Sequence, residues 1–498
     1  MRPQPKVLAL TEIADGFELS GESVGVLVSG ITHNSREVLP GDIYVALQGA
    51  NHHGIEFAPQ AIANGAAAIA TDQTGINELV DVELPLIRLT EPRIEMAKLA
   101  ARVYQNPEQK LKLIGVTGTN GKTSVTHILK SLFENFGYQV GVIGTIGTYI
   151  DGNFLPGTRT TPESTDLYAV LAKMVEAKVT HVFMEVSSHA LELHRVAGLQ
   201  FDEAVFTNLS QDHLDFHGSM ENYFGAKAKL FTKEFAKHCV ICVDDIWGQK
   251  LADQTLLPKS TVNSTANLTA DWNVKDLHLA VTNTEFLLGF GLQDLPCCIP
   301  MIGQFNATNA AIAIATAVSL GLDFELATHE LAKVLPVPGR SQIVTHNSLG
   351  TAIVDYAHTP EAVEKVLSTL REVCAGQLIT VIGCGGDRDA TKRPLMGAIA
   401  AEISDVVVVS DDNPRSENPA TIRQAIITGI PDFTNALEQQ TLLEIGDRRA
   451  AIKYALTRAG HNDVIAVLGK GHEQGQEIAG TIYPFDDVTV IAEEAANV

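Results

Sequence analysis

The chain has 498 residues, of which 45% are apolar and 19% charged, and its formal net charge is −23. This composition excludes a disordered chain, and the length predicts about three domains, because one hydrophobic core does not serve so many residues. The acidic balance excludes nucleic acid and anionic membranes as main partners, since both need concentrated Lys and Arg.

Cysteine usage and apolar runs exclude further classes. Six cysteines make no disulfide framework. Cys239 and Cys242 fall in a predicted strand, where positions three apart point to opposite faces, so we reject a zinc site there. We expect no signal peptide and no membrane span, because the apolar runs are too short or too interrupted. A cytoplasmic protein is therefore expected, and we separately expect a monomer.

The N-terminal region predicts a small α/β unit. Short strands are expected within Ile31–Leu47, an alanine-rich helix and a strand within Phe57–Thr71, and a further strand at Pro85–Leu89. A helix over Glu91–Tyr104 then links this unit to the rest of the chain.

The middle of the chain alternates apolar runs with helical segments, which predicts a mostly parallel sheet covered on both faces. An antiparallel extension is expected over Ala266–Cys298, followed by a buried helix over Asn306–Leu320. The expected strands of the parallel sheet are Leu111–Val116, Gln139–Ile143, His181–Val186, Ala204–Thr207 and Cys239–Val243.

Pro336–Gly339 is a proline-glycine cluster that indicates a domain hinge. Beyond it, apolar strands again alternate with helices and predict a second doubly wound, Rossmann-like sheet. We therefore predict an α/β protein with three domains at residues 1–90, 91–338 and 339–498. The expected strands of the last domain are Thr351–Asp355, Leu378–Gly383, Val406–Ser410 and Val464–Leu468.

The segment Gly118–Ser124 reads Gly-Thr-Asn-Gly-Lys-Thr-Ser and lies between a predicted strand and a predicted helix, Val125–Phe136. Backbone N–H groups and the helix dipole would face an anion there, Lys122 adds a positive charge, and the Thr123 hydroxyl suits Mg²⁺. The usual nucleotide-loop spacing requires glycine at Val116, so the generic motif fails by one position. ATP binding is still favoured over a plain strand-to-helix turn.

Ionisable residues follow two of the predicted strands. Glu185 stands where a nucleotide-bound Mg²⁺ needs a carboxylate, because ligands of open α/β sheets bind at the carboxyl ends of strands. The segment Thr207–His217 contains two Asp and two His within six residues. This pattern is compatible with metal or acid–base chemistry and equally with helix caps and turns.

These motifs resemble those of the Mur ligases of peptidoglycan synthesis. The resemblance runs in order over nearly the whole chain, and it includes a phosphate loop without the first glycine. It implies that ATP phosphorylates a carboxylate, that an amine attacks the acyl-phosphate, and that ADP and phosphate leave. The segments that carry it are residues 118–123, Glu185–His189, Thr207–His213, Gly303–Asn309, Gly339–Arg340 and Asp355–Pro360.

Three later motifs resemble the family members that add meso-2,6-diaminopimelate to the D-glutamyl γ-carboxylate of UDP-N-acetylmuramoyl-L-alanyl-D-glutamate. Arg415 would bind the distal carboxylate, for which a forked guanidinium is suited and which L-lysine lacks. The motifs are Gly385–Asp389, Asp412–Arg415 and Gly469–Glu473. The implied diaminopimelate contacts are Arg388, Asp412, Asn413, Pro414, Arg415, Gly469 and Glu473.

The resemblance also implies the ATP and metal residues. Lys122, Glu185, His213 and Lys227 would be catalytic, with Mg²⁺ held by Thr123, Glu185, His213 and Lys227, the last as a carbamate. The implied ATP contacts are Gly118, Thr119, Asn120, Gly121, Lys122, Thr123, Ser124, Asn306, Asn309, Arg340, Asp355 and His358.

The implied contacts to the UDP-sugar peptide are Ser35, Thr160, Thr161, Ser187 and Arg195. Arg159 and Leu193 depart from the family pattern, because some members carry Asn and Gln there. Lys122 and Arg415 lie in different predicted sheets, so domain closure is expected to bring the substrates together.

Three alternatives remain open at this point. The chain could be a lysine-adding relative, a folylpolyglutamate synthase, or a catalytically silent protein that senses UDP-muramoyl peptides. The N-terminal unit and Asp412–Arg415 oppose a folylpolyglutamate synthase. The joint presence of Lys122, Glu185, His213 and Lys227 opposes a silent protein.

Overall fold

The computed structural model describes residue 3 and residues 6–49, 51–79, 82–157, 159–265, 269–347 and 349–497. The chain divides into two compact units. The first contains Met1–Trp272 and Ile312–Asp323, and the second contains Asn273–Ala311 and Phe324–Val498. Ala266, the first residue of the predicted antiparallel extension, lies outside the described residues.

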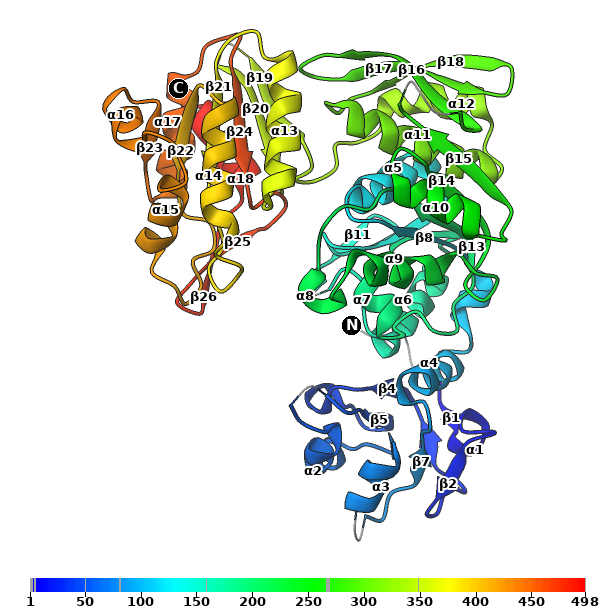
Figure 1. Cartoon of the computed structure of the whole chain (residues 1–498). Helices are drawn as coiled ribbons and strands as arrows, with labels where there is room; N and C mark the ends of the chain where they lie inside the picture. The colour runs from blue at the N-terminus through cyan, green and yellow to red at the C-terminus, as the bar shows by residue number, and fades with distance from the viewer. Residues whose placement is uncertain are drawn as a thin grey trace. The chain divides into compact units, whose positions relative to one another are not determined.

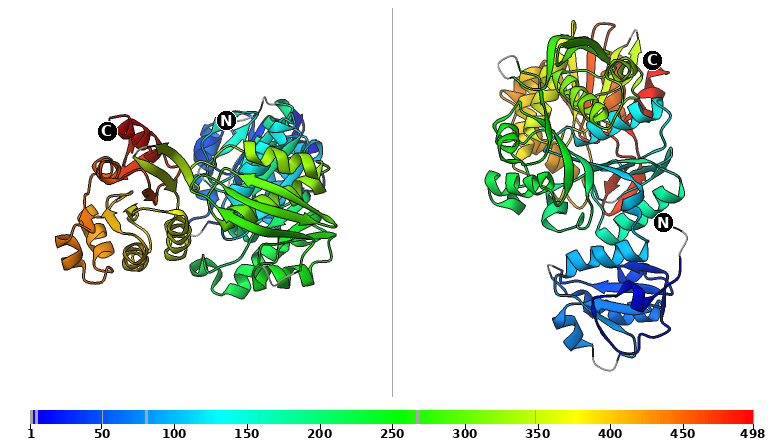
Figure 2. Two further views of the ribbon diagram at one scale, coloured as in Figure 1. Left: turned by 90° about the horizontal axis from the view of Figure 1, so that it is seen from above. Right: turned by 90° about the vertical axis from the view of Figure 1, so that its right-hand side faces the viewer.

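The first unit begins with a five-stranded sheet in the order β2-β7-β6-β5-β4, drawn in blue in Figure 2. Strands β4 to β7 run parallel, and β2 pairs antiparallel with β7. A separate pair, β1 and β3, lies beside it. The elements are β1 (Leu8–Ala9), α1 (Leu10–Ile13), β2 (Glu18–Ser20), β3 (Leu27–Val28), β4 (Gly30–Thr32), β5 (Asp42–Ala46), α2 (Ala58–Ala63), β6 (Ala68–Thr71), α3 (Gln73–Glu78) and β7 (Leu86–Arg88).

Helix α4 (Pro92–Val103) links this sheet to the central sheet. Proline at the first helical position fits an N-terminus, since its missing N–H has no partner there in any helix. Its apolar side, including Met96, Leu99 and Val103, joins one large core with residues of both sheets. The N-terminal sheet is therefore packed through α4 onto the central part of the same unit.

The central sheet of the first unit has the order β11-β10-β9-β12-β8-β13-β14-β15. Strands β9, β12, β8, β13, β14 and β15 are parallel, so their carboxyl ends lie along one edge. Its strands are β8 (Lys112–Thr117), β9 (Val140–Ile143), β10 (Thr148–Ile150), β11 (Asn153–Leu155), β12 (His181–Glu185), β13 (Phe201–Phe206), β14 (Ala236–Cys242) and β15 (Lys259–Asn263).

Helices connect these strands as the alternating pattern predicts. Figure 1 shows them around the central sheet in cyan and green. They are α5 (Lys122–Asn135), α6 (Ser164–Glu176), α7 (Ser188–Glu192), α8 (Leu214–His217), α9 (Met220–Ala228) and α10 (Ile246–Gln254). Helix α5 begins at Lys122, three residues before the predicted start, because Gly121 takes a left-handed φ of 87° and opens the helix directly after the loop.

The second unit contains the predicted antiparallel extension. Strands β16 (Trp272–Leu279), β17 (Thr284–Phe290) and β18 (Gln293–Ile299) are neighbours in this order, and β17 pairs antiparallel with β18. Helix α11 (Gln304–Ser319) follows, with Ala307 and Ala310 fully buried as its alanine content predicts. Its residues up to Ala311 belong to the second unit, and those from Ile312 belong to the first. Helix α12 (Phe324–Glu330) comes after it.

The C-terminal sheet has the order β19-β20-β24-β21-β22-β23. All pairs from β20 to β23 are parallel, and β19 is antiparallel to β20. Its elements are β19 (Gln342–Asn347), β20 (Gly350–Asp355), α13 (Pro360–Val373), β21 (Leu378–Ile382), α14 (Lys392–Ile403), β22 (Val406–Val409), α15 (Pro419–Ile427), α16 (Phe433–Glu438), β23 (Leu442–Glu444), α17 (Arg448–Arg458), β24 (Val464–Leu468), β25 (Gly475–Ile478), β26 (Thr481–Pro484) and α18 (Asp487–Ala495).

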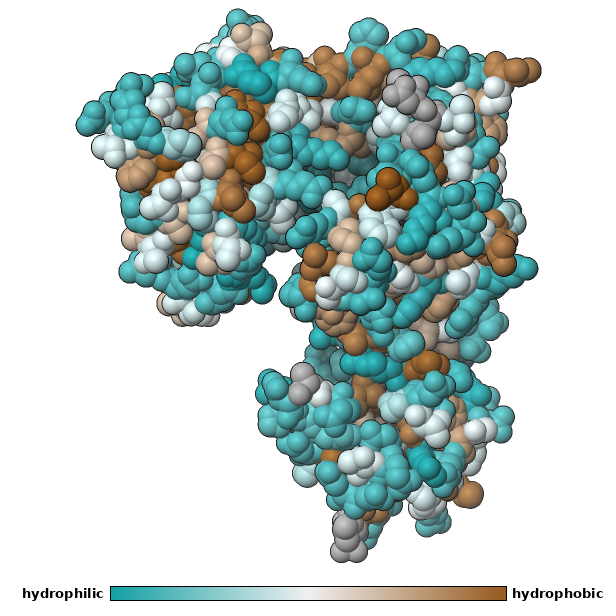
Figure 3. Space-filling view, viewed as in Figure 1, coloured by the Kyte–Doolittle hydropathy of each residue, from teal (hydrophilic) through white to brown (hydrophobic). Residues whose placement is uncertain are grey.

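Two hydrophobic cores cover the two faces of this sheet. One contains residues of α13, α14 and α15, and the other contains residues of α17 and α18. Figure 1 shows the same layers around the yellow-to-red strands. The α/β class and its doubly wound sheets are thus confirmed, and the face in Figure 3 is mostly hydrophilic, as expected for layers that bury their apolar sides.

Candidate active site

The phosphate loop follows β8 and packs against the residue after β13. Gly118 has a φ of 149°, and a Cβ atom there would collide with the Thr207 hydroxyl oxygen. Val116, where the generic motif requires glycine, is a fully buried residue of β8 in register with Glu185 and Val205. The first glycine is therefore needed at 118, because the strand continues through 116 and the close approach comes two residues later.

The rest of the loop is held by Asn208. Its backbone oxygen accepts from the Thr119 N–H at 2.9 Å, and its side-chain oxygen accepts from the Asn120 N–H at 3.0 Å. Thr123 and Ser124 are buried in the first turn of α5. The loop and the start of α5 therefore have the strand–turn–helix context that a phosphate cradle requires.

Two lysines converge on the Gly118 carbonyl oxygen. The Lys122 ammonium donates to it at 2.9 Å and also to the Thr119 oxygen, and the Lys227 Nζ donates to it at 2.8 Å. Lys227 is buried on α9, and its pKa is lowered well below the usual value by burial and by the positive Lys122, against the opposing effect of Asp212. The sequence-predicted pair Lys122 and Lys227 is thus brought together.

Glu185, at the carboxyl end of β12, is the centre of an oxygen-rich cluster. It is 1% exposed, and it accepts from the Thr123 hydroxyl at 2.9 Å and from the Thr145 N–H and hydroxyl at 2.9 and 3.0 Å. The Thr145 hydroxyl also contacts the Thr160 hydroxyl at 3.0 Å. Hydroxyl and carboxylate oxygens are donors that Mg²⁺ prefers.

The predicted contacts to the UDP-sugar peptide continue from this cluster. The Thr161 hydroxyl donates to the Glu185 carbonyl at 2.7 Å and accepts from the Ser187 N–H at 3.1 Å. Arg195 donates to the Thr161 carbonyl at 3.3 Å. Ser35 is the exception, because its hydroxyl donates to Gln60 within the N-terminal part of the unit. Thr160, Thr161, Ser187 and Arg195 are thus contiguous, and Ser35 is not among them.

His213 belongs to an aromatic cluster after β13. It has a left-handed φ of 52°, is about half exposed, and lies 3.5 Å from the Asp212 carboxylate. Its ring centroid is 4.8 Å from that of His189 and 6.2 Å from that of Tyr223, whose hydroxyl contacts the Thr119 hydroxyl. His213 therefore borders the phosphate loop through Tyr223. Among the described residues, no three His, Cys, Asp or Glu side chains form a group that could hold a metal ion.

The predicted ATP contacts of the second unit form two groups. Asn306 and Asn309 are buried in the first turns of α11, where the Asn306 amide donates to the Ile302 carbonyl. In the other group, the buried Asp355 carboxylate accepts from the Ser341 N–H at 2.6 Å and from the Ala357 N–H at 2.8 Å. Burial raises the pKa of Asp355, against the effects of Arg340 and of these hydrogen bonds.

The Arg340 guanidinium lies over an aromatic ring, 4.9 Å from the Tyr356 ring centroid. Tyr356 also contacts the rings of His358 and His472, with centroids 4.6 and 5.1 Å apart. Flat rings beside a guanidinium can stack on a nucleotide base. The sequence did not predict this arrangement, because it does not show which aromatic residues lie next to Arg340. Arg340 and His358 are thus near one another, as the sequence predicts, and Tyr356 is an additional candidate.

The predicted diaminopimelate contacts gather at the carboxyl ends of β22 and β24. The Asn413 amide donates to the Glu473 carboxylate at 2.6 Å, and its oxygen accepts from the Glu477 N–H at 2.9 Å. Arg415 has a left-handed φ of 51°, donates to the Gly386 carbonyl at 2.6 Å, and lies 3.3 Å from the Glu477 carboxylate. The cation of Arg415 is therefore held between the Gly386 carbonyl and the Glu477 carboxylate.

The remaining predicted contacts differ in their positions. Gly469 has a φ of 111°, and a Cβ atom there would lie 2.6 Å from an Asp412 carboxylate oxygen, so only glycine fits. Pro414 is buried between Asn413 and Arg415. Arg388 is exposed on the loop after β21. Asp412 and Gly469 are thus in contact. Among the described residues, Arg388 is not seen to contact either of them.

Lys470 is a further functional candidate, which lies inside the motif Gly469–Glu473 but has no predicted role of its own. It is fully buried, and its Nζ lies 3.7 Å from Asp412, 3.4 Å from Glu473 and 3.2 Å from the Asn413 oxygen. It also donates to the Gly475 carbonyl at 2.6 Å. The sequence feature that could have identified Lys470 is its position directly after an apolar strand and between two glycines.

Comparison with known proteins agrees with this geometry. Three family models match: "Mur ligase family, catalytic domain" over residues 27–108, "Mur ligase middle domain" over 116–317, and "Mur ligase, glutamate ligase domain" over 339–471. A Streptomyces coelicolor protein named UDP-N-acetylmuramoyl-L-alanyl-D-glutamate--2,6-diaminopimelate ligase is 42% identical over 97% of this chain and 96% of its own length. The chain belongs to the Mur ligase family.

Other Mur ligases give the same result. A Corynebacterium glutamicum protein of the same name is 42% identical over 97% of this chain and 96% of its own length. A solved structure with that name is 32% identical, covers 99% of both chains and has a TM-score of 0.71. A folylpolyglutamate synthase structure from Mycobacterium tuberculosis is 19% identical with a TM-score of 0.60, which shows a shared fold alone.

Proposed function

We propose that this Mur ligase forms an amide bond between meso-2,6-diaminopimelate and the D-glutamyl γ-carboxylate of UDP-N-acetylmuramoyl-L-alanyl-D-glutamate, with ATP as co-substrate. In peptidoglycan precursor synthesis this step activates the carboxylate as an acyl-phosphate, which the amine of diaminopimelate attacks. The phosphate loop at Gly118–Ser124 would bind the triphosphate. Lys122 would offset the charge repulsion between the phosphate and the carboxylate.

The observation that carries the choice of acceptor is the Arg415 cation, which is held by the Gly386 carbonyl and the Glu477 carboxylate. Asn413, in the same segment, donates to Glu473. An amino acid with a carboxylate at its distal end gains a charge-assisted pair with Arg415, whereas the ammonium of L-lysine would be repelled. Glu473 can accept from the acceptor's ammonium. The names of the similar proteins agree with this choice.

A Mg²⁺ ion fits the donor set at the end of β12. Thr123 and Glu185 present a hydroxyl and a carboxylate to one another within 2.9 Å. The ion would supply positive charge to the transferring phosphate when bound. These two residues are proposed to hold it, and the two threonines at positions 145 and 160 would keep the Glu185 carboxylate oriented.

The second predicted metal position needs a chemical change at Lys227. An ammonium cannot bind a cation, whereas a carbamate on Nζ has two oxygen ligands. A neutral amine is the form that adds CO₂, and the lowered pKa of buried Lys227 favours that form. We therefore propose that the carbamate of Lys227 and the side chain of His213 are ligands of the second metal ion.

The proposed reaction is tested with the purified chain, ATP, UDP-N-acetylmuramoyl-L-alanyl-D-glutamate and either meso-diaminopimelate or L-lysine. Phosphate release and a product heavier by one diaminopimelate residue, seen by mass spectrometry, are expected. Preference for L-lysine would reject the acceptor assignment. Absence of product with either amine, while ATP binds, would favour a sensing protein.

Three further predictions belong to this proposal. We propose functional domains at residues 1–90, 91–338 and 339–498, for substrate nucleotide, ATP and amino acid respectively. A monomer in the cytoplasm is proposed, with small molecules as its only partners. Among the described residues, no helix combines the length and apolar character needed to cross a membrane.

A further inference from the structure

Three arginines converge on one buried carboxylate in the first unit. Glu163 is 6% exposed in its side chain, and its oxygens lie 3.1 Å from Arg93, 2.6 Å from Arg159 and 2.8 Å from Arg195. One carboxylate balances one guanidinium, so the cluster has two formal positive charges in excess. We call these four residues the Arg93–Glu163 cluster.

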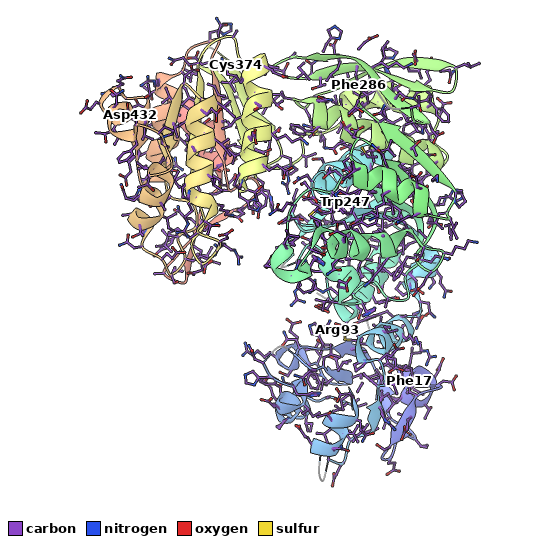
Figure 4. The ribbon with its side chains drawn as sticks, viewed as in Figure 1. Phe17, Arg93, Trp247, Phe286, Cys374 and Asp432 are labelled. Carbon is purple, nitrogen blue, oxygen red and sulfur yellow. The ribbon has the colours of Figure 1, made fainter. Side chains whose placement is uncertain are left out.

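The cluster joins segments that are far apart in the sequence. Arg93 lies at the start of α4, where Figure 4 labels it between the N-terminal sheet and the central part of the unit. Glu163 is the residue before α6, and its side chain makes no cap bond to that helix. Its carboxylate is therefore committed to the arginines, although residues at this position commonly cap the helix.

The cluster continues directly into the proposed substrate site. Arg195 donates to the Thr161 carbonyl, and the Thr161 hydroxyl donates to the Glu185 carbonyl. The side chain of Arg195 is 12% exposed, compared with 31% for Arg93 and 48% for Arg159. The inner arginine thus adjoins the proposed metal carboxylate, and the outer two are reachable by a ligand.

The three guanidinium groups of the cluster repel one another because they are close together. Burial lowers the pKa of Arg195, Glu163 opposes this, and Arg159 and Arg93 lower it further. Arg195 Nε, moreover, is buried without a well-aligned hydrogen bond among the described residues, although it lies within ion-pair distance of Glu163. Cations so arranged are stabilised when a further anion binds.

A cavity of about 340 Å³ opens beside Arg93. His194, Leu47 and Gln48 also line it, so it has walls from both the N-terminal sheet and the loop before Arg195. The acidic Asp72 and Glu91 lie on its wall as well. An oxyanion in this cavity would therefore lie at Arg93, the arginine of the cluster that lines it, while hydroxyl or N–H groups of the same ligand could donate to the acidic wall.

We propose that Arg93, Arg159 and Arg195 form one anion-binding site for the UDP-linked substrate, and that Glu163 is the positioning residue that holds their guanidinium groups. The inference rests on the proposed function. It adds Arg93 as a ligand-binding residue and Glu163 as a positioning residue, and it gives an anion-binding role to Arg159 at a position where some family members carry Asn. The bound oxyanion is either the diphosphate or the peptide carboxylate of that substrate, since a guanidinium fork matches both.

Steady-state kinetics and calorimetry of the full chain test the site. Arg93→Met and Arg159→Met are each expected to raise KM for the UDP-peptide roughly tenfold or more, with KM for ATP and kcat within about twofold. Arg93→Lys should recover part of the loss. Lys98→Met removes an exposed cation from the same helix and is expected to change none of these values.

Glu163→Gln distinguishes positioning from simple charge. This change increases the net positive charge, so a purely electrostatic role predicts tighter binding of the UDP-peptide. Loss of the organising carboxylate predicts weaker binding instead, roughly tenfold or more. Tighter binding by this variant would overturn the positioning role of Glu163.

Binding of UDP, UDP-N-acetylmuramate and the full UDP-peptide identifies the oxyanion. Equal weakening of all three by Arg93→Met assigns the diphosphate, whereas weakening of the UDP-peptide alone assigns its carboxylate. Unchanged binding of all three to both methionine variants would overturn the site. If the unmodified chain makes no tripeptide product, the proposed function fails, and these binding measurements still decide the inference separately.

Discussion

Arg415 shows how a single residue can select the acceptor. Its backbone takes a left-handed conformation, and its side chain is fixed by the Gly386 carbonyl and by Glu477. A residue held this way has little rotamer entropy left to lose when it binds a carboxylate. The guanidinium is therefore preorganised for a ligand with a fixed anionic end.

Replacement of Arg415 by alanine is expected to cost the acceptor about 2 kcal/mol or more, because one charge-assisted pair is lost. KM for meso-diaminopimelate should then rise roughly 30-fold or more, and discrimination against L-lysine should fall. Competition between the two amines, followed by mass spectrometry of the product, measures both effects. Undiminished discrimination in Arg415→Ala would show that selection lies elsewhere.

The ligase activity of the chain is expected to depend on CO₂, because Lys227 must carry a carbamate. Depletion of bicarbonate should lower the activity of the unmodified chain, and its return should restore it, since a carbamate forms reversibly on a neutral amine. Lys227→Arg introduces a permanent cation that cannot take up CO₂ in this way, and it should be inactive at every bicarbonate concentration. Activity measurements across bicarbonate concentrations check this, and full activity of Lys227→Arg would contradict it.

The sequence predicted the site residues that lie directly after a strand. Glu185, Asp412 and Gly469 each follow or end an apolar run, and parallel strands bring such ends to one edge. The Arg93–Glu163 contact was not predictable, because 70 residues separate its partners. The direction of the Lys122 side chain was also hidden, since it depends on where the Gly118 carbonyl points.

At the scale of elements, a buried carboxyl group on strand β13 accepts a hydrogen bond from helix α11. The Ser319 hydroxyl donates to Glu203 at 2.6 Å, and the second Glu203 oxygen is buried without a partner among the described residues. Burial raises the pKa of Glu203 to about 7, against the effect of the Ser319 hydrogen bond. The contact is therefore a point where the packing of α11 depends on pH.

The sign of this dependence follows from proton binding. The folded chain keeps the Glu203 proton up to about pH 7, and the unfolded chain releases it near the ordinary glutamate pKa of 4.5. The stability contribution is fully present below pH 4.5 and is lost as pH rises to about 7. Glu203→Gln should thus stabilise the chain by about 1–2 kcal/mol at pH 8 and by much less at pH 5.

Thermal unfolding midpoints of Glu203→Gln and the unmodified chain at the two pH values check this expectation. A useful control is Ser319→Ala, which should destabilise the chain because it removes the remaining hydrogen bond of the buried carboxyl. An equal shift of the Glu203→Gln midpoint at both pH values would contradict a titration of Glu203.

Sheet order was only partly accessible from the sequence. The apolar runs predicted the strands to within a few residues, as β8 and β24 show. The position of β24 between β20 and β21 could not be read from the same pattern. That position matters because it places Lys470 beside Asp412, and the strands that carry them are separated by more than fifty residues.

At the scale of the whole molecule, the proposed phosphate and amine sites belong to different units. Gly118–Ser124 lies in the first unit, and Asp412–Arg415 lies in the second. Reaction between their ligands requires the reacting atoms to approach within about 3–3.5 Å, so an arrangement of the units that permits this contact must be reached in each turnover.

Domain closure is therefore expected when both substrates bind. The radius of gyration from small-angle X-ray scattering should decrease when a non-hydrolysable ATP analogue and the UDP-peptide are present together, and less with either alone. Hinge substitutions at Pro338 are expected to alter kcat and KM together, because the segment 336–339 precedes the C-terminal sheet. Constant dimensions in all ligand states would reject closure.

The Gly118 carbonyl has two donors, the Nζ groups of Lys122 and Lys227. A carbonyl oxygen has two lone pairs, so either donor can leave and the oxygen still has a hydrogen bond. When Lys122 moves to a nucleotide phosphate, the loop therefore keeps one anchor to helix α9. Redundant anchoring of this kind lets one lysine exchange its partner while the backbone that presents it stays in place.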